Sequence, residues 1–219
     1  MSKHDGIYRR LFSHPILVED LVRSLLGDEM LSELRTETLE PLPAHYVSEE
    51  LEQREDDAVW RLRHTGDERG WFYIYLLLEF QASVDRFMAL RVMTYTSLLC
   101  QEIAKRQETD TGGRLPPVVP IVIYNGDATW SAPLDVGALF PRVGVLDVLR
   151  PRFRYLLVDE ARHPLSSLPP HSPLRTVLEL EQARSPEALQ QAVVTAADLV
   201  EHLEDDALRR DLETWLRRV

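Results

Sequence analysis

The sequence predicts a single α/β domain built on buried strands, and three segments carry that prediction. Residues 71–81, WFYIYLLLEFQ, are apolar at both alternating sets of positions, which is typical of a central strand covered from two sides. Residues 118–124, VVPIVIY, form a second buried strand that ends at a turn pair, Asn125–Gly126. Between them, residues 84–107 repeat apolar side chains at helical spacing.

The first third of the chain supplies a helical region and the partner of a strand hairpin. Residues 5–26 have helical spacing on either side of a break at Pro15, and Gly27 is expected to stop the helix. Residues 28–43 predict a short helical piece followed by a loop. Residues 58–63, AVWRLR, predict a strand that pairs with residues 71–81 across the turn-like HTGDERG.

The rest of the chain is predicted to be one more strand and several helices. Ser83 is the expected N-cap of the helix at residues 84–107, with Asp85 in its first turn. Residues 153–158 predict a fourth strand. From Pro173 the pattern is helical to the end, with breaks near residues 185–186 and 205–206. We therefore expect a core domain at residues 1–172 and a helical extension at residues 173–219 packed on it.

Composition points to an ordinary globular protein. The chain has 219 residues, of which 44% are hydrophobic and 28% charged. It contains no apolar run long enough to span a bilayer, and its start lacks the pattern of a signal peptide. The single cysteine, Cys100, cannot form an internal disulfide. We expect a cytoplasmic protein that does not associate with membranes.

Several enzyme classes are disfavoured by the sequence. The seven histidines give no HExxH and no other zinc spacing, and neither GxGxxG nor GxxxxGK[ST] occurs. The formal net charge of −11 counts against tight, metal-free binding of DNA, because affinity for DNA comes largely from neutralised phosphates.

Two carboxylates nevertheless predict a metal site. Glu79 follows an unbroken apolar run near the end of its strand, where an ionised carboxylate is costly unless a cation or hydrogen-bond donors compensate. Gln81 lies two residues on, and therefore on the same face of the strand. Asp57 begins the partner strand, so a hairpin could bring it beside Glu79. Oxygen ligands from neighbouring strands are what Mg²⁺ prefers.

At these residues the sequence resembles a known family. The segments REDDAVWRLR, YIYLLLEFQASVDRFMALRVMTY and LPPVVPIVIYNG resemble the recombination-promoting nuclease/putative transposase family, the YhgA-like branch of the PD-(D/E)XK superfamily. The resemblance runs from His4–Asp5 to about Trp130. It implies a restriction-endonuclease-like core, a central mixed sheet flanked by helices, followed here by the helical extension.

The resemblance also implies site residues and an activity. Asp57 and Glu79 match the metal ligands, and Gln81 stands where the superfamily name has lysine, as is usual in this branch. Glutamine can hold a water molecule but carries no positive charge. We expect a Mg²⁺-dependent DNA endonuclease, with Mn²⁺ as a substitute, linked to recombination or mobile elements. Further candidates are Glu50 or equally Glu49 as an additional ligand, and Arg91 or Arg86 as a phosphate contact.

Other interpretations stay open at this point. Asp57 could be a solvated acidic turn, Glu79 could form a structural ion pair with Arg91 or Arg86, and the fold could serve as a catalytically inactive binding or assembly module. A transposase with the RNase H fold would need Asp127 or Asp159 together with Glu179, an order that fits the strands poorly. DNA is the expected partner, and a homodimer is an open alternative to a monomer.

Overall fold

A mixed five-stranded sheet forms the centre of the molecule. The computed structural model of the chain describes residues 5–42, 57–65, 67–79, 84–110, 112–126 and 128–217. The strands lie in the order β1-β2-β3-β4-β5; the pairs β1–β2 and β2–β3 are antiparallel, and the pairs β3–β4 and β4–β5 are parallel. Their bounds are β1 (Leu34–Pro41), β2 (Asp57–His64), β3 (Asp67–Glu79), β4 (Val118–Tyr124) and β5 (Leu156–Asp159).

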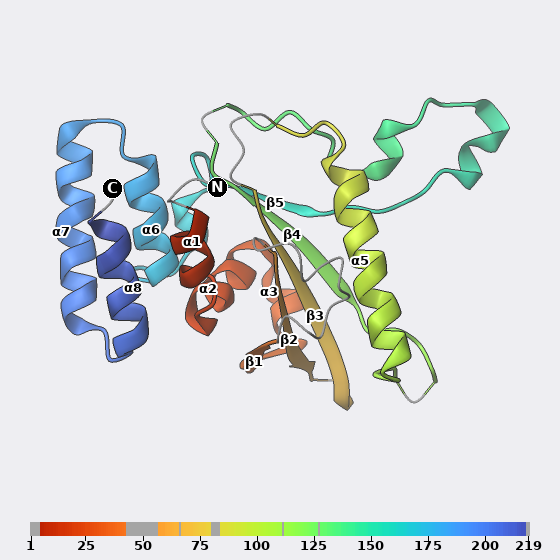
Figure 1. Cartoon of the computed structure of the whole chain (residues 1–219), viewed down its shortest axis with the longest axis horizontal. Helices are drawn as coiled ribbons and strands as arrows, with labels where there is room; N and C mark the ends of the chain where they lie inside the picture. The colour runs from red at the N-terminus through yellow and green to blue at the C-terminus, as the bar shows by residue number, and fades with distance from the viewer. Residues whose placement is uncertain are drawn as a thin grey trace.

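Helices cover both faces of this sheet (Figure 1). On one face lie the first helices and the C-terminal group, and on the other lies the long helix α5. The bounds are α1 (Asp5–Leu11), α2 (Pro15–Leu25), α3 (Asp28–Leu31), α5 (Met88–Lys105), α6 (Pro173–Gln182), α7 (Pro186–His202) and α8 (Asp206–Leu216), with short 3-10 turns η2 (Val136–Leu139), η3 (Gly144–Leu149) and η4 (Leu165–Ser167).

Alternation along β3 divides the core into two layers. Ile74 belongs to a cluster that includes Trp60 and side chains of α1, α2, α6 and α8. Tyr73 and Tyr75, the residues on either side of Ile74, belong to a second cluster with Val59 and the buried face of α5. Successive residues of a strand point to opposite faces, so a strand sandwiched in this way has to be apolar throughout. This confirms the prediction of a central strand covered from two sides.

The sequence predictions fail at one element and at several boundaries. Residues 34–41, expected as a loop, form the edge strand β1, which pairs only with β2 and alternates weakly in burial. β3 begins at Asp67 rather than Trp71, so the hairpin turn is shorter than HTGDERG suggested. An edge strand and a hairpin turn have few core contacts, and their sequences therefore carry a weak hydrophobic pattern.

Two further boundaries shift because local hydrogen bonds compete with the expected element. Helix α5 begins at Met88, since the Asp85 carboxylate accepts a hydrogen bond from the backbone N–H of Phe87 at 2.8 Å ahead of the first turn. Ser83, the expected N-cap, lies outside the described residues. β5 begins at Leu156 rather than at residue 153, because Arg154 instead forms an isolated bridge with Asp135.

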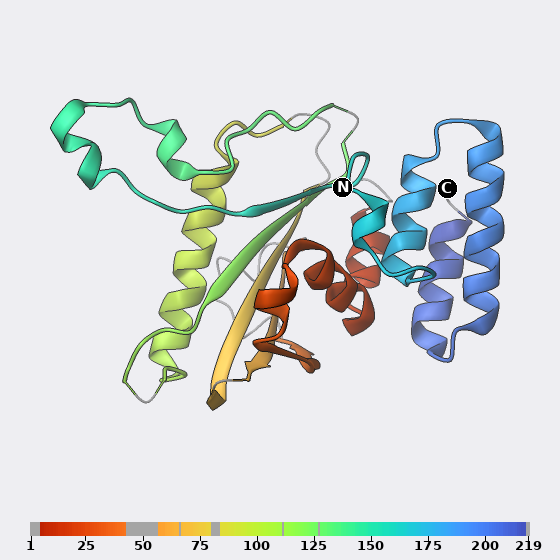
Figure 2. The same cartoon turned by 180° about the vertical axis from the view of Figure 1, so that it is seen from behind.

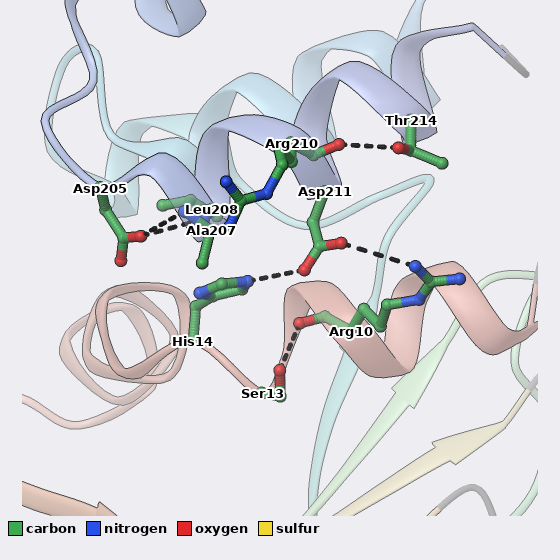
Figure 3. Close-up of polar contacts among 9 residues, drawn as sticks. All are labelled: Arg10, Ser13, His14, Asp205, Ala207, Leu208, Arg210, Asp211 and Thr214. Atoms are coloured by element: carbon green, nitrogen blue, oxygen red, sulfur yellow. Dashed lines mark hydrogen bonds and ion pairs between the residues drawn. The ribbon is translucent and has the colours of Figure 1, made fainter.

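A polar contact joins α8 to the junction of α1 and α2 (Figure 3). His14 Nε2 lies 2.9 Å from Asp211 Oδ2, although 197 residues separate the two in the sequence. His14 is buried, and Arg10 approaches the second carboxyl oxygen of Asp211 at 3.8 Å. The Asp205 carboxylate caps α8 by accepting hydrogen bonds from the N–H groups of Ala207 and Leu208. The contact between His14 and Asp211 joins α8 to the segment between α1 and α2.

A buried acidic cluster lies where α1, α6 and the end of β5 meet. The Tyr8 hydroxyl donates a hydrogen bond to Glu181 at 2.5 Å, and Glu160, which follows β5, is completely enclosed beside them. Burial raises the pKa of Glu160 well above its ordinary value, and the negative charge of Glu181 adds to the shift. Burial likewise raises the pKa of the Tyr8 hydroxyl. The folded protein therefore favours a neutral carboxylic acid at residue 160.

No helix in the described ranges is long and apolar enough to cross a membrane.

Replacing Asp211 with alanine is expected to lower the free energy of unfolding by about 1–3 kcal/mol, because His14 is left buried without this partner. The measurement is urea unfolding at neutral pH. Glu213→Ala is the matched control, since it removes the same charge from α8 but breaks only a surface ion pair with Arg217 and should cost less than about 0.5 kcal/mol. Equal losses for the two variants would contradict the prediction.

Glu160→Gln is expected to raise the melting temperature at pH 8 and to have a smaller effect near pH 4.5, the ordinary glutamate pKa. Because the pKa is raised in the folded state, the unfolded chain releases this proton first, so wild-type stability falls as the pH rises above that value. Each pKa unit corresponds to about 1.4 kcal/mol. The readout is thermal unfolding across this range, with Glu201→Gln, on the exposed side of α7, as the control. A wild-type-like pH profile in Glu160→Gln would refute the assignment.

Candidate metal centre at the carboxyl edge of the sheet

The carboxyl ends of β3, β4 and β5 form one edge of the sheet because these strands are parallel. Glu79 ends β3 and pairs with Tyr124 at the end of β4, which pairs with Asp159 at the end of β5. Since β2 runs antiparallel to β3, its first residue, Asp57, belongs to the same edge. Open α/β sheets bind ligands outside the carboxyl ends of their strands. The topology thus brings the two predicted metal ligands to an edge suited to a site.

The backbone register gives the relation between the two acidic positions. Asp57 pairs with Leu77, which lies two residues before Glu79. Residues opposite one another, and residues two apart on one strand, belong to the same face of a sheet. Val59 and Tyr75 continue this series and lie in the cluster beneath α5. Positions 57 and 79 therefore share the face that α5 covers; the structure describes the backbone of both residues but not their side chains.

Helix α5 brings Arg91 toward this edge. The helix runs antiparallel to β3, because Glu108, just beyond the helix, accepts a hydrogen bond from Tyr73 while Tyr95 packs on Tyr75, with ring centroids 6.5 Å apart. Arg91 precedes Tyr95 by one turn and is half-buried, so it lies on the sheet side of the helix and nearer to the end of β3. A guanidinium at this position suits recognition of a phosphate.

Asp85 and Arg86 lie just before the first turn of α5. Arg86 is exposed on the approach to the helix. Burial raises the pKa of Tyr155 to about 12, and the neighbouring Asp85 carboxylate adds to the shift. Tyr155 therefore keeps its hydroxyl proton at neutral pH, and that hydroxyl donates to the Pro133 carbonyl at 3.2 Å. We assign Tyr155 a structural role rather than one in proton transfer.

An aromatic chain that the sequence analysis did not single out extends from the end of β4. The ring of Tyr124 lies 4.9 Å from Trp130, and Trp130 lies 6.4 Å from Tyr155, both edge-on. Tyr124 is buried and occupies the register position beside Glu79. The sequence signal that could have identified Tyr124 is its position as the last residue of the buried run at residues 118–124. These rings pack the end of β4 against the segment that leads into β5.

Some predicted residues cannot be placed. Gln81, Glu50 and Glu49 lie outside the described residues, so their proposed roles stay predictions. Within the part of the chain whose side chains are described, no three His, Cys, Asp or Glu residues are grouped so as to hold a metal ion. The side chains of Asp57 and Glu79 lie outside this part of the chain. The donor chemistry of these two residues, carboxylate oxygens at the ends of adjacent strands, fits a hard divalent cation.

Two of the three residues of the RNase H interpretation form ion pairs with arginines close to them in the sequence. Asp159 forms an ion pair with Arg162 at 3.1 Å, and Glu179 forms one with Arg175 at 2.7 Å. Asp127 lies outside the described residues. Glu160, the other acid at this edge, belongs with Tyr8 to the polar cluster on the opposite face of the sheet from α5. The described geometry thus gives no support to a site built on Asp159 and Glu179.

Comparison with known proteins agrees with the fold and with the resemblance noted in the sequence. The chain is 28% identical over 133 residues to the recombination-promoting nuclease RpnD of Escherichia coli O157:H7, which covers 59% of this chain and 49% of the relative. It is 27% identical over 128 residues to the inactive recombination-promoting nuclease-like protein RpnE of Escherichia coli K12, covering 58% and 40%. For the recombination-promoting nuclease RpnA of the same strain, identity is 26% over 57% of this chain and 40% of the relative.

The chain spans half or less of the length of these three curated relatives. No solved structure matches the chain significantly. The mixed sheet flanked by helices confirms the predicted restriction-endonuclease-like α/β fold. The sequence profile of the family described as "Putative transposase, YhgA-like" matches residues 2–211, nearly the whole chain. The chain therefore belongs to the YhgA-like transposase family.

Proposed function

We propose that the chain is a metal-dependent endonuclease that hydrolyses DNA phosphodiester bonds in recombination or mobile-element activity. The observation that carries the proposal is the strand register, which brings Asp57 and Glu79 to the same edge and the same face of the sheet. The names of the relatives support it, because RpnD and RpnA are called recombination-promoting nucleases. DNA is accordingly the proposed substrate.

In this mechanism the chain's own residues would bind the metal ion, orient the attacking water and neutralise charge on the phosphate. Asp57 and Glu79 would hold Mg²⁺, with Glu50 or Glu49 as a further ligand. When bound, the ion polarises the scissile phosphate and lowers the pKa of a bound water. Gln81 would orient the attacking water through its side-chain amide, and it supplies no positive charge where the superfamily name has lysine. Arg91 or Arg86 would stabilise the negative charge that develops on the phosphate.

Asp57→Asn and Glu79→Gln are each expected to lower Mg²⁺-dependent nicking of supercoiled plasmid by about a hundredfold or more, because each removes one negatively charged ligand while keeping the side-chain size. Nicking is read by gel electrophoresis of time courses with and without EDTA. Asp56→Asn is the matched control, since it removes an adjacent charge that is not assigned to the site. If purified wild type and Asp57→Asn nick plasmid at the same rate, the proposal is wrong.

A second candidate function is a catalytically inactive nuclease fold that acts in binding or assembly. One specific observation favours it, namely that a relative of similar identity, RpnE, is named inactive. Glutamine at position 81 and the net charge of −11 are in keeping with it. The two candidates differ in whether the carboxyl edge binds a metal ion.

Calorimetric titration with Mn²⁺ separates the two functions. For the endonuclease we expect saturable binding by wild type, at least about tenfold weaker binding by Asp57→Asn, and unchanged binding by Asp56→Asn, because a hard cation loses most when a charged oxygen ligand is lost. Binding that is absent from wild type, or the same in all three proteins, would favour the inactive module.

A further inference from the structure

Residues 136–154 form an excursion between β4 and β5 that we call the arm. It contains η2 and η3 and projects beyond α5, on the side away from α6, α7 and α8 (Figures 1 and 2). Val136 is buried in the cluster under α5, and Arg150 donates a hydrogen bond to the Gly137 carbonyl at 2.6 Å. The arm is therefore anchored at its base beside the first turns of α5.

The arm is positively charged, whereas the chain as a whole is negatively charged. It holds four arginines and one aspartate, in a chain whose formal net charge is −11. Asp147, the one aspartate of the arm, has its partners within the arm. It accepts a hydrogen bond from the Val143 N–H at 2.7 Å and lies 3.8 Å from Arg150. Arg142, Arg152 and Arg154 are exposed, and none of them makes an ion pair with any residue in the described ranges. Three cationic side chains are thus presented to solvent.

These arginines surround a hollow in the protein surface. The hollow has a volume of about 920 Å³, and its charged lining consists of all four arginines of the arm and two aspartates, Asp135 and Asp147. The lining therefore carries more positive than negative charge, and a concave surface of net positive charge attracts anionic ligands. The planar guanidinium also matches the oxygen atoms of a phosphate, which it can contact through two parallel hydrogen bonds.

Packed aromatic rings connect the arm to the proposed catalytic edge. The aromatic chain from Tyr124 through Trp130 to Tyr155 links the end of β4 with the residue that follows Arg154. The bridge between Arg154 and Asp135 holds the two stems of the excursion together. A DNA strand whose scissile phosphate sits at the edge would therefore have neighbouring phosphates within reach of the arm.

We propose that the arm binds the phosphate backbone of DNA through Arg142, Arg152 and Arg154, beside the catalytic edge. This proposal rests on the DNA substrate proposed above. An acidic protein needs a local basic surface to bind DNA, and in this proposal the arm is that surface. The contact is to phosphates, so it contributes affinity and register but no sequence preference.

A competing occupant is a second copy of this chain. Val145, Val148 and Leu149 at the tip of the arm are 90%, 75% and 77% exposed, which is unusual for apolar side chains. The arginines and their hollow favour DNA, because contact between two copies through the apolar tip would not account for three exposed arginines that have no ion-pair partner in the described ranges. The oligomeric state is therefore measured in the same experiment.

The test compares DNA binding by the full chain and a triple variant, Arg142→Gln, Arg152→Gln and Arg154→Gln. Binding of a fluorescently labelled DNA duplex is followed by anisotropy in EDTA at several salt concentrations. We expect at least about tenfold weaker binding, and a plot of log K against log salt whose slope is smaller by about 3, since each lost phosphate contact reduces it by about 1. A triple Arg→Lys variant should keep the wild-type slope, because the charge is retained.

The matched control is Arg184→Gln, Arg210→Gln and Arg217→Gln, which removes the same charge from exposed positions on and between the C-terminal helices. It should bind within about twofold of wild type, and thermal unfolding should show that both triple variants are folded. Equal losses in the two variants would overturn the proposal. So would an arm variant that binds DNA normally but loses a dimer in sedimentation.

Plasmid nicking, measured in parallel, separates this proposal from the proposed function. If wild type does not nick DNA but binds it through the arm, the endonuclease proposal fails and the arm proposal stands. If wild type nicks DNA and the arm variant binds and nicks it normally, the arm proposal fails alone. A wild-type chain that shows no DNA binding at low salt overturns the arm proposal outright.

Discussion

Coverage of β3 on both faces is the constraint on which the rest of the molecule depends. Its backbone pairs with β2 and β4, and apolar side chains from two helical layers pack above and below it. A charged side chain in the middle of such a strand would lose its hydration with nothing to compensate. Polar chemistry is therefore restricted to the strand ends, and the carboxyl end is where α5 and the arm also converge.

The central elements could be predicted from the sequence because burial leaves a strong pattern. β4 has the predicted bounds of residues 118–124, and the breaks near residues 185 and 205 separate α6, α7 and α8 as expected. Glu79 could be proposed because a carboxylate after a long apolar run is conspicuous, whereas Asp57 could be proposed from the expected hairpin and from the family resemblance. The register that brings them to one face needed the pairing of β2 with β3, which the hairpin implied but periodicity alone could not fix.

Features that depend on contacts between distant segments could not be predicted. β1 is an edge strand with a weak pattern, and Tyr124 becomes part of the site only through its pairing with Glu79. Three arginines of the arm lie close together in the sequence, in RPRFR at residues 150–154, whereas Arg142 precedes them by eight residues. Their grouping around one hollow depends on the path of the chain between β4 and β5. Sequence patterns report local periodicity, whereas these features come from tertiary packing.

The contact between His14 and Asp211 has a consequence for how the protein acquires its structure. The chain is made from its first residue onward, so α1 and α2 exist long before the helix against which they pack. Contacts between such distant segments are slow to form, because a long loop must close before they contribute stability. Tyr8, in α1, packs on Trp215 in α8 and lies beside the end of β5. The packing around Tyr8, beside the end of β5, is thus completed only after synthesis has reached α8.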